Sequence, residues 1–186
     1  MGKDKAFLTF KDKTFLRWIL EALEKQCNQI IIVGNKEKEL YKKQTEGIKT
    51  SIEVIKDIYP YQGPLNGIVS ALEFIPYKHT FIASCDTPLI NHKLIPFFYE
   101  KIDNYEAVIP VVKNRYQPLN TLYKTDALYK AKEIFIHGNR SMFSFINRLN
   151  LQYIPEEEIT NLDKHLYTYW SINTPKDYTD LTKIEI

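Results

Sequence analysis

The sequence predicts an α/β protein with a three-layer α/β/α architecture, in which helices cover both faces of a mainly parallel sheet. Short apolar runs rich in isoleucine and valine alternate along the chain with segments of helical periodicity. These runs are apolar throughout, as expected for strands that are buried on both faces. The chain has 186 residues, a length typical of one domain, so residues 1–186 are expected to form a single domain.

Helix and strand patterns alternate in the first half of the chain. Apolar residues recur at helical spacing over residues 15–23 and lead into a β-branched run at residues 30–33, which ends at Gly34. Four further elements are expected in this half: a charged helix, an apolar extended segment, a second helix and a short strand, at residues 36–41, 52–58, 68–74 and 81–83.

The same alternation continues after Pro88, which ends regular structure at that point. Three helices are expected in this half, at residues 93–102, 126–135 and 141–149. Four strands are expected, at residues 107–112, 119–124, 151–154 and 167–172. Ligands of such folds bind beyond the carboxyl ends of the strands. Asn35 and Asp86, which follow two of the apolar runs, are therefore candidate site residues.

Composition narrows the class of partner. Lysine and arginine total 25 against 23 acidic residues, a formal net charge of +2, which argues against a dedicated nucleic-acid binder. Cys27 and Cys85 lie far apart in sequence and match no metal-ligand or redox spacing, which is typical of a reducing compartment such as the cytoplasm. No apolar run approaches the ~18–20 residues of a membrane span, and no signal-peptide pattern opens the chain. A small-molecule partner is favoured, with no membrane partner.

Asp86 is the strongest single candidate. It lies where an apolar run opens into a loop containing Pro88, so its carboxylate is expected to project over the ligand crevice. Magnesium prefers hard oxygen ligands, typically one or two carboxylates completed by phosphate oxygens and water. An Asx-turn, in which the carboxylate bonds to the backbone near Thr87, explains the same position. Position alone leaves both interpretations open.

A glycine-flanked turn precedes the helical pattern at residues 68–74, and its sequence is Gly63-Pro64-Leu65-Asn66-Gly67. Backbone N–H groups at such a helix start can face an anion or a flat base. A plain connecting turn explains the motif almost as well.

Four polar side chains have a functional and a simpler structural interpretation. Lys5 could contact phosphate or be solvated, and Arg140 could bind phosphate or carboxylate or be a surface charge. Asn35 could bond a base or ribose, or cap the helix expected at residues 36–41. Asn173 precedes Pro175 in a pattern typical of a helix start.

Five short motifs follow one another along the chain: Met1-Gly2-Lys3-Asp4-Lys5-Ala6, Gly63-Pro64-Leu65-Asn66-Gly67-Ile68, Cys85-Asp86-Thr87-Pro88-Leu89, Gln117-Pro118-Leu119 and Ile172-Asn173-Thr174-Pro175-Lys176-Asp177. Taken in this order, they resemble the motifs of the molybdenum cofactor guanylyltransferase family. The resemblance covers essentially the whole chain, and the Gly-Pro-Leu and Asp-Thr-Pro segments are its most specific parts. It implies a Rossmann-like nucleotidyltransferase fold.

The resemblance also implies an activity. GMP would pass from GTP to the molybdopterin cofactor, forming its guanine dinucleotide form and releasing pyrophosphate, with Mg2+ required. Catalysis would rest on Lys5, at the nucleotide phosphates, and Asp86, as the magnesium ligand. Further nucleotide contacts would come from Asn35, Asp57, Gly63, Pro64 and Leu65, and the pterin or metal side would include Gln117, Arg140 and Asn173. GTP, molybdopterin and molybdoenzyme maturation proteins are the partners that follow, without nucleic acid.

The chain departs from the family pattern in two places. The usual Asn-x-Asn near the last strand is Ser171-Ile172-Asn173 here. Family members also carry a buried strand and a loop of the form Leu-Ala-Gly-Gly-x-Ser-x-Arg before Met-Gly-x-Asp-Lys, whereas this sequence starts at Met1. Such a loop supplies backbone donors for a triphosphate, and each large apolar side chain of the strand would add ~1.5–3 kcal/mol. We therefore expect the working protein to be longer, with residues 1–186 N-terminally incomplete relative to the family.

Two alternatives stay open at this level. One is another nucleotidyltransferase of similar architecture that uses CTP or acts on a sugar phosphate. The other is a non-catalytic relative that binds nucleotide or pterin, which the missing phosphate loop favours. Selective stabilisation by one nucleotide would separate the first from the guanylyltransferase interpretation.

Overall fold

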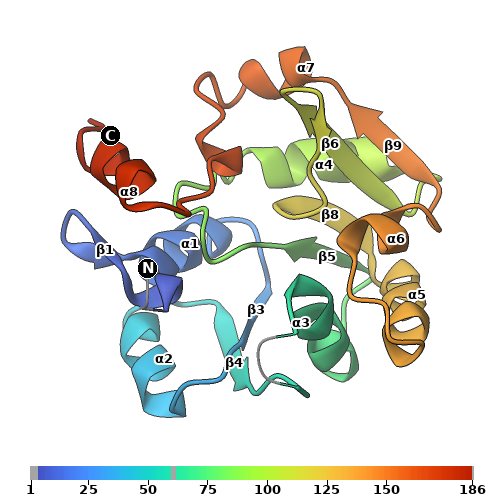
Figure 1. The fold of residues 1–186 in the computed structure, drawn as a ribbon, viewed down its shortest axis with the longest axis horizontal. Helices are drawn as coiled ribbons and strands as arrows, with labels where there is room; N and C mark the ends of the chain where they lie inside the picture. The colour runs from blue at the N-terminus through green and yellow to red at the C-terminus, as the bar shows by residue number, and fades with distance from the viewer. Residues whose placement is uncertain (1–3, 60–61, 186) are drawn as a thin grey trace.

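The computed structural model describes residues 4–59 and 62–185 (Figure 1). The first half of the chain forms η1 (Lys5–Phe7), β1 (Thr9–Phe10), β2 (Lys13–Thr14), α1 (Phe15–Leu23), β3 (Gln29–Val33), α2 (Lys38–Thr45), β4 (Ser51–Ile55), α3 (Pro64–Ala71) and η2 (Leu72–Phe74). The second half forms β5 (His79–Ile82), α4 (Leu94–Ile102), β6 (Ala107–Val112), β7 (Arg115–Tyr116), β8 (Thr121–Lys124), α5 (Thr125–Ile136), α6 (Met142–Ile146), β9 (Leu151–Ile154), α7 (Glu156–Thr160), η3 (Tyr167–Tyr169) and α8 (Pro175–Thr182).

The strands form a mixed rather than a mainly parallel arrangement. β3 and β4 are a parallel pair, in register from Gln29 opposite Ser51 to Val33 opposite Ile55. A second sheet has the order β5-β8-β6-β7, with β9 parallel to β6. β8 runs antiparallel to both β5 and β6. The short connection from β6 through β7 explains this reversal, because a parallel return needs a crossover of about a dozen residues or more.

Helices cover both faces of these strands, which confirms the predicted three-layer α/β/α class. On one face, α3, α5 and α6 pack against β6 and β8. On the other face, α1 packs against β3, and α4 and α7 pack against β6 and β8. Among the described residues, no helix is long and apolar enough to cross a membrane.

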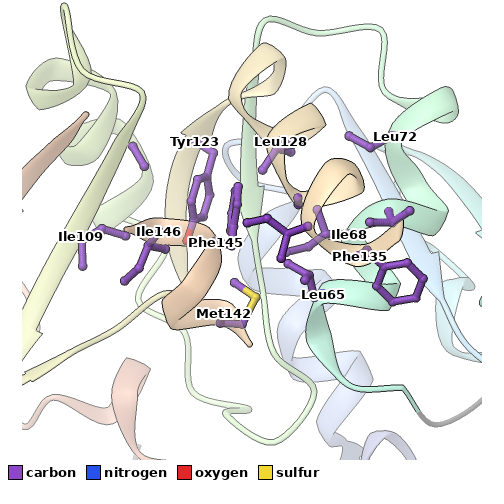
Figure 2. Packing of buried hydrophobic residues seen from close by; sticks show 14 residues of the cluster. Leu65, Ile68, Leu72, Ile109, Tyr123, Leu128, Phe135, Met142, Phe145 and Ile146 are labelled. Atoms are coloured by element: carbon purple, nitrogen blue, oxygen red, sulfur yellow. The ribbon is translucent and has the colours of Figure 1, made fainter. Parts of the chain in front are cut away.

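The largest apolar cluster joins α3, α5 and α6 to the sheet. Figure 2 shows Phe145 and Ile146 of α6 beside Tyr123 and Ile109 of the strands. The rings of Tyr123 and Phe145 stack with centroids 5.7 Å apart. Burial raises the pKa of Tyr123 well above its ordinary value, and its hydroxyl donates to the Pro118 carbonyl at 2.7 Å. Each large apolar side chain buried here contributes ~1.5–3 kcal/mol, so this cluster anchors α3 firmly on the sheet.

Most predicted elements are confirmed to within a few residues, but two helices begin elsewhere. The helix predicted at residues 68–74 begins earlier, at Pro64, because proline is favoured in a first helical turn. The helix predicted at residues 36–41 begins later and is anchored by Tyr41, which is 3% exposed. A Cβ on Gly34 would clash with the Tyr41 hydroxyl, so glycine is required where β3 ends.

The strand predicted at residues 167–172 is wrong, because a 3₁₀ turn forms there instead. The carboxylate of Asp163 accepts the backbone N–H groups of Tyr167 at 3.1 Å and Thr168 at 2.9 Å. Leu166 adopts a left-handed conformation with φ 55°. Backbone donors that a strand would need are therefore satisfied locally.

The two end segments of the described chain pack together. Phe10 and Phe15 form one buried cluster with Ile172 and Leu181 of the C-terminal segment, and Figure 1 shows α8 above β1 and α1. The Tyr178 hydroxyl donates to the Thr9 carbonyl at 2.6 Å. This packing brings the segment before α8 close to the segment before β1.

Candidate active site

Asp86 lies in a turn that directly follows β5. The Thr87 amide donates to the Ser84 carbonyl at 3.3 Å, and the Ser84 hydroxyl donates to the Asp86 carboxylate at 2.6 Å. No backbone amide of the described residues donates to this carboxylate. The Asx-turn interpretation is therefore wrong, and the side chain, 23% exposed, is accessible to a ligand.

The buried side chain of Asn120 holds this turn in place. Its side chain accepts the Ser84 amide at 3.0 Å and donates to the Thr87 hydroxyl at 2.8 Å and to the Thr168 carbonyl at 2.7 Å. Asn120 is 2% exposed and adopts a left-handed conformation with φ 55°. Asparagine tolerates this conformation better than most other residues. One buried amide thus fixes the backbone on either side of Asp86.

Lys5 and Asn173 join Asp86 from opposite ends of the chain. The Lys5 ammonium lies 3.7 Å from the Asp86 carboxylate and donates a hydrogen bond to the side-chain oxygen of Asn173. The Ile172 amide donates to the Asp86 carbonyl at 2.8 Å. A capping box between Thr174 and Asp177 starts α8 immediately after Asn173. The sequence prediction that Lys5, Asp86 and Asn173 belong near one site is consistent with this grouping.

A second polar cluster lies after β3 and β4. The Asp57 carboxylate accepts hydrogen bonds from the amide nitrogens of Asn35 and Asn66, both at 2.8 Å. Burial raises the pKa of Asp57, although these two hydrogen bonds oppose the shift. Asn35 makes no capping bond to α2, whose N-cap is Glu37, so the capping interpretation is wrong. The cluster offers a half-buried carboxylate held between two amides.

The glycine-flanked turn forms the start of α3 and places the Leu65 side chain in the core. Gly63 has φ 81°, a conformation that favours glycine, and Pro64 occupies the first turn of α3. Leu65 is completely buried in the apolar cluster. Only backbone atoms of Leu65 can therefore face a ligand.

One cavity extends from Asp57 to the turn that carries Asp86. It has a volume of about 760 Å³, and its lining includes Asp57 and Gly63 from one cluster and Ser84 and Cys85 beside the other. Most of its remaining lining is apolar and belongs to the strands and helices between the clusters. The arrangement places a carboxylate–lysine pair and a carboxylate–amide cluster at the edge of a shared apolar cavity.

Two predicted residues lie apart from both clusters. The Arg140 guanidinium stacks 3.6 Å above the Phe135 ring and donates to the Phe135 carbonyl at 2.7 Å. Gln117 donates to the Arg115 carbonyl at 3.3 Å. Neither contacts Lys5 or Asp86, so a role on the pterin side stays a prediction for both.

Sequence reasoning missed the supporting residues Ser84, Asn66 and Asn120. The sequence did contain a signal for Asn120. This asparagine directly precedes a run of residues suited to a buried strand, and a buried amide requires hydrogen-bond partners. Asn66 was part of the glycine-flanked motif, but its contact with Asp57 depends on how α3 meets the end of β4.

Comparison with known proteins shows the family of this chain. Residues 1–153 match the family described as MobA-like NTP transferase domain. The chain belongs to this family. It is therefore a nucleotidyltransferase with the α/β fold of that class, as the sequence predicted.

Individual relatives cover nearly the whole chain. A Clostridium perfringens (strain 13 / Type A) protein named "Probable molybdenum cofactor guanylyltransferase" is 31% identical over 97% of this chain and 88% of its own length. Molybdopterin-guanine dinucleotide biosynthesis protein A from Archaeoglobus fulgidus superimposes with a TM-score of 0.78 at 22% identity, covering 97% and 90% of the two chains. The 2-C-methyl-D-erythritol 4-phosphate cytidylyltransferase of Thermus thermophilus superimposes with a TM-score of 0.70 at 15% identity, covering 97% of this chain and 93% of its own. At these identities the two structures support the fold alone.

Cys85 is expected to be dispensable as a nucleophile. The residue is partly solvent-exposed, but crowding by protein atoms raises the pKa of its thiol to about 11, and the carboxylates of Asp86 and Asp4 add to the shift. The thiol is therefore almost wholly protonated at neutral pH. Cys85→Ser should leave nucleotide binding unchanged. The rate at which iodoacetamide alkylates Cys85, measured in a Cys27→Ser background, should keep rising with pH up to about pH 11. A plateau near pH 9.0, the ordinary thiol value, would contradict the assignment.

Asn66→Ala should destabilise the protein. Asn66 is completely buried, and its amide nitrogen donates to Asp57 at 2.8 Å and to the Tyr59 carbonyl at 2.6 Å. Loss of these bonds should lower the free energy of unfolding by about 1–3 kcal/mol, measured by urea denaturation. Exposed Asn161 provides the control, and Asn161→Ala should leave the transition midpoint unchanged. Equal midpoints for both variants would contradict the role of Asn66.

Proposed function

We propose that this chain transfers GMP from GTP to the terminal phosphate of molybdopterin and releases pyrophosphate. The observation that carries the proposal is the pairing of Lys5 with Asp86 in the turn after β5, next to Ser84 and Cys85, which line a cavity together with Asp57. The guanylyltransferase name of the Clostridium perfringens relative supports the choice of nucleotide and acceptor.

The nucleoside end of GTP is assigned to the cluster after β3 and β4. Asn35 is exposed, and its amide nitrogen already donates to Asp57, so base or ribose hydroxyl and N–H groups can find both donors and acceptors here. A half-buried carboxylate with a raised pKa keeps strong acceptor capacity once it is ionised. The backbone around Gly63 borders the same cavity and provides a face for a flat base.

The phosphate end is assigned to Lys5 and its neighbours. The Lys5 ammonium is 27% exposed and can neutralise phosphate oxygens as a point charge. Asn173, which accepts a hydrogen bond from Lys5, orients this ammonium. In the reaction, an oxygen of the pterin phosphate bonds to the α-phosphorus as the bond to the β-phosphate oxygen breaks. Lys5 would stabilise the negative charge that pyrophosphate carries away.

Magnesium is assigned to Asp86. Among the described residues, no group of three or more His, Cys, Asp or Glu side chains could hold a metal alone. Magnesium commonly uses one or two carboxylates together with substrate phosphates and water, so Asp86 can contribute one of its ligands. One oxygen of Asp86 accepts from Ser84 and the other faces Lys5. When bound, the ion would supply positive charge to the reacting phosphates.

Nucleotide-selective stabilisation tests the proposal. The melting temperature should rise with GTP and Mg2+ and much less with ATP, CTP or UTP, because a ligand at 100 times its dissociation constant stabilises by about 2.7 kcal/mol. Transfer of label from α-phosphate-labelled GTP to molybdopterin should follow. Preferential stabilisation by CTP would overturn the assignment in favour of a cytidylyltransferase.

A further inference from the structure

The carboxyl ends of β5, β6 and β9 lie along one edge of the structure. β8 runs antiparallel to both β5 and β6, and β9 runs parallel to β6, so β5, β6 and β9 point in one direction. Figure 1 shows β5 between β3 on one side and β8, β6 and β9 on the other. Asp86 follows β5, and the polar cluster around Asp57 follows β3 and β4. The part of the edge beyond β6 and β9 therefore lies on the far side of Asp86 from the Asp57 cluster.

Two half-exposed tyrosines occupy this part of the edge. Tyr116 lies in β7, shortly after the end of β6, and is 42% exposed, and Tyr153 lies in β9 and is 46% exposed. Their rings stack with centroids 5.0 Å apart and planes inclined by 30°. Tyr116 lies opposite Val111 and Tyr153 lies opposite Ile109, so both tyrosines come from strands that pair with β6. The pair forms an exposed aromatic surface near the carboxyl end of β6.

The tyrosine pair lies on the face of the sheet that α3 covers. Side chains alternate between the two faces along a strand, and cross-strand neighbours share a face. Leu151, two residues before Tyr153, packs against the buried cluster that contains Ile109 and residues of α3. Tyr116 pairs with β6 two residues after Ile109, which puts its side chain on the same face. The start of α3 at Gly63 was assigned to the nucleoside, so one face of the sheet carries both the nucleoside end and the tyrosine pair.

The spacing between the tyrosine pair and Asp86 suits an elongated acceptor. β8 alone separates β5 from β6, and neighbouring strands are about 4.8 Å apart, so β5 and β6 lie roughly 10 Å apart. Ile82, the last residue of β5, lies opposite Thr121, whose hydroxyl donates to the Val108 carbonyl of β6, so the two strands reach the edge at a similar height. A pterin ring with a phosphate-bearing side chain is of comparable length. Its ring can lie on the tyrosines while its phosphate reaches the nucleotide phosphates beside Asp86.

We infer that Tyr116 and Tyr153 form the stacking surface for the pterin ring of the acceptor substrate. The inference rests on the proposed function, because that function makes a pterin the acceptor. Aromatic side chains stack favourably on flat heterocycles, and tyrosine supplies a large contact surface at a low cost in conformational entropy. The nucleoside and the pterin ring then lie on opposite sides of Asp86, and the phosphates of both substrates meet between them.

A fluorescent pterin tests the inference. Hydroxymethylpterin monophosphate serves as the probe, and its binding to the 186-residue chain is followed by quenching of the pterin emission. Tyr116→Leu and Tyr153→Leu should each weaken binding at least about tenfold, the usual effect of losing one stacking ring. Tyr116→Phe and Tyr153→Phe keep the ring and should bind like the wild type. Tyr129 is 43% exposed in α5, and Tyr129→Leu is the matched control that should leave binding unchanged.

GTP binding keeps this test separate from that of the proposed function. The affinity for GTP with Mg2+ should be the same in all these variants, since the tyrosines lie away from the nucleoside cluster. The inference would be overturned if the wild type failed to bind the probe, or if Tyr116→Leu and Tyr153→Leu bound it as tightly as Tyr129→Leu. Weaker GTP binding in the two leucine variants would also overturn it, because the rings would then stack on guanine. None of these outcomes changes which nucleotide stabilises the wild type.

Discussion

Asp86→Asn is expected to reduce the rate of GMP transfer by about 10²–10³-fold, the usual cost of removing one electrostatic contact to a reacting group. Asparagine keeps an oxygen that can accept from the Ser84 hydroxyl, which donates at 2.6 Å. It removes the negative charge that the magnesium assignment requires. Magnesium titration in the presence of GTP should show correspondingly weaker metal binding.

Stability should change little in the same variant. The Lys5–Asp86 pair spans 3.7 Å and both side chains are partly exposed, and pairs of this kind contribute about 0–1 kcal/mol. Asp180→Asn is the matched control, because Asp180 forms a surface pair with Lys183 at 2.9 Å in α8. The control should retain full activity. Activity of Asp86→Asn at the level of Asp180→Asn would remove Asp86 from the mechanism.

Asn120→Ala is expected to cause the largest loss of stability. Alanine cannot make the three side-chain hydrogen bonds to Ser84, Thr87 and Thr168, and each buried group left unsatisfied costs about 1–3 kcal/mol. The left-handed backbone at φ 55° adds to this loss, because alanine tolerates that conformation less well than asparagine. The sum approaches the ~5–15 kcal/mol of a typical domain. Urea denaturation should show a partly unfolded or strongly shifted protein.

Asn120→Gly separates the two contributions. Glycine loses the same hydrogen bonds but adopts the left-handed conformation without strain, so it should be more stable than the alanine variant by about 1 kcal/mol. In the fraction that remains folded, magnesium-dependent GTP binding should be weaker in both variants, because the turn around Asp86 is no longer held. Wild-type binding in either variant would show that Asn120 supports the fold alone.

The sequence was sufficient for the elements that bury large apolar surfaces. Residues 107–112 are apolar throughout, which predicts the strand β6, and the apolar residues of α1 recur on one face, which predicts a helix. The positions of Asn35 and Asp86 after apolar runs were equally readable, since the chain order alone places them at strand ends. Local periodicity reports burial directly, which is why these predictions were correct.

Only the tertiary structure could settle contacts between distant segments. Lys5 meets Asn173 because a buried cluster of Phe10, Phe15, Ile172 and Leu181 packs α8 against the N-terminal segment. The 3₁₀ turn at Tyr167–Tyr169 replaced a predicted strand because Asp163 satisfies its backbone donors. The same limitation applied to Arg140, whose partner is the Phe135 ring. The sequence shows which hydrogen bonds or ion pairs a polar side chain can form, but tertiary packing determines which partner it contacts.

The pairing of β3 and β5 shows the same division. Each strand was predicted from its own residues, because apolar β-branched runs are typical of buried strands. Their partners, β4 for β3 and β8 for β5, were not predictable, since strand pairing depends on which backbones lie side by side. The sequence by itself therefore determined the α/β class and the strand ends that carry the candidate site. The tertiary structure decided which polar groups meet there and which strands pair, because hydrogen bonding is satisfied in space rather than along the chain.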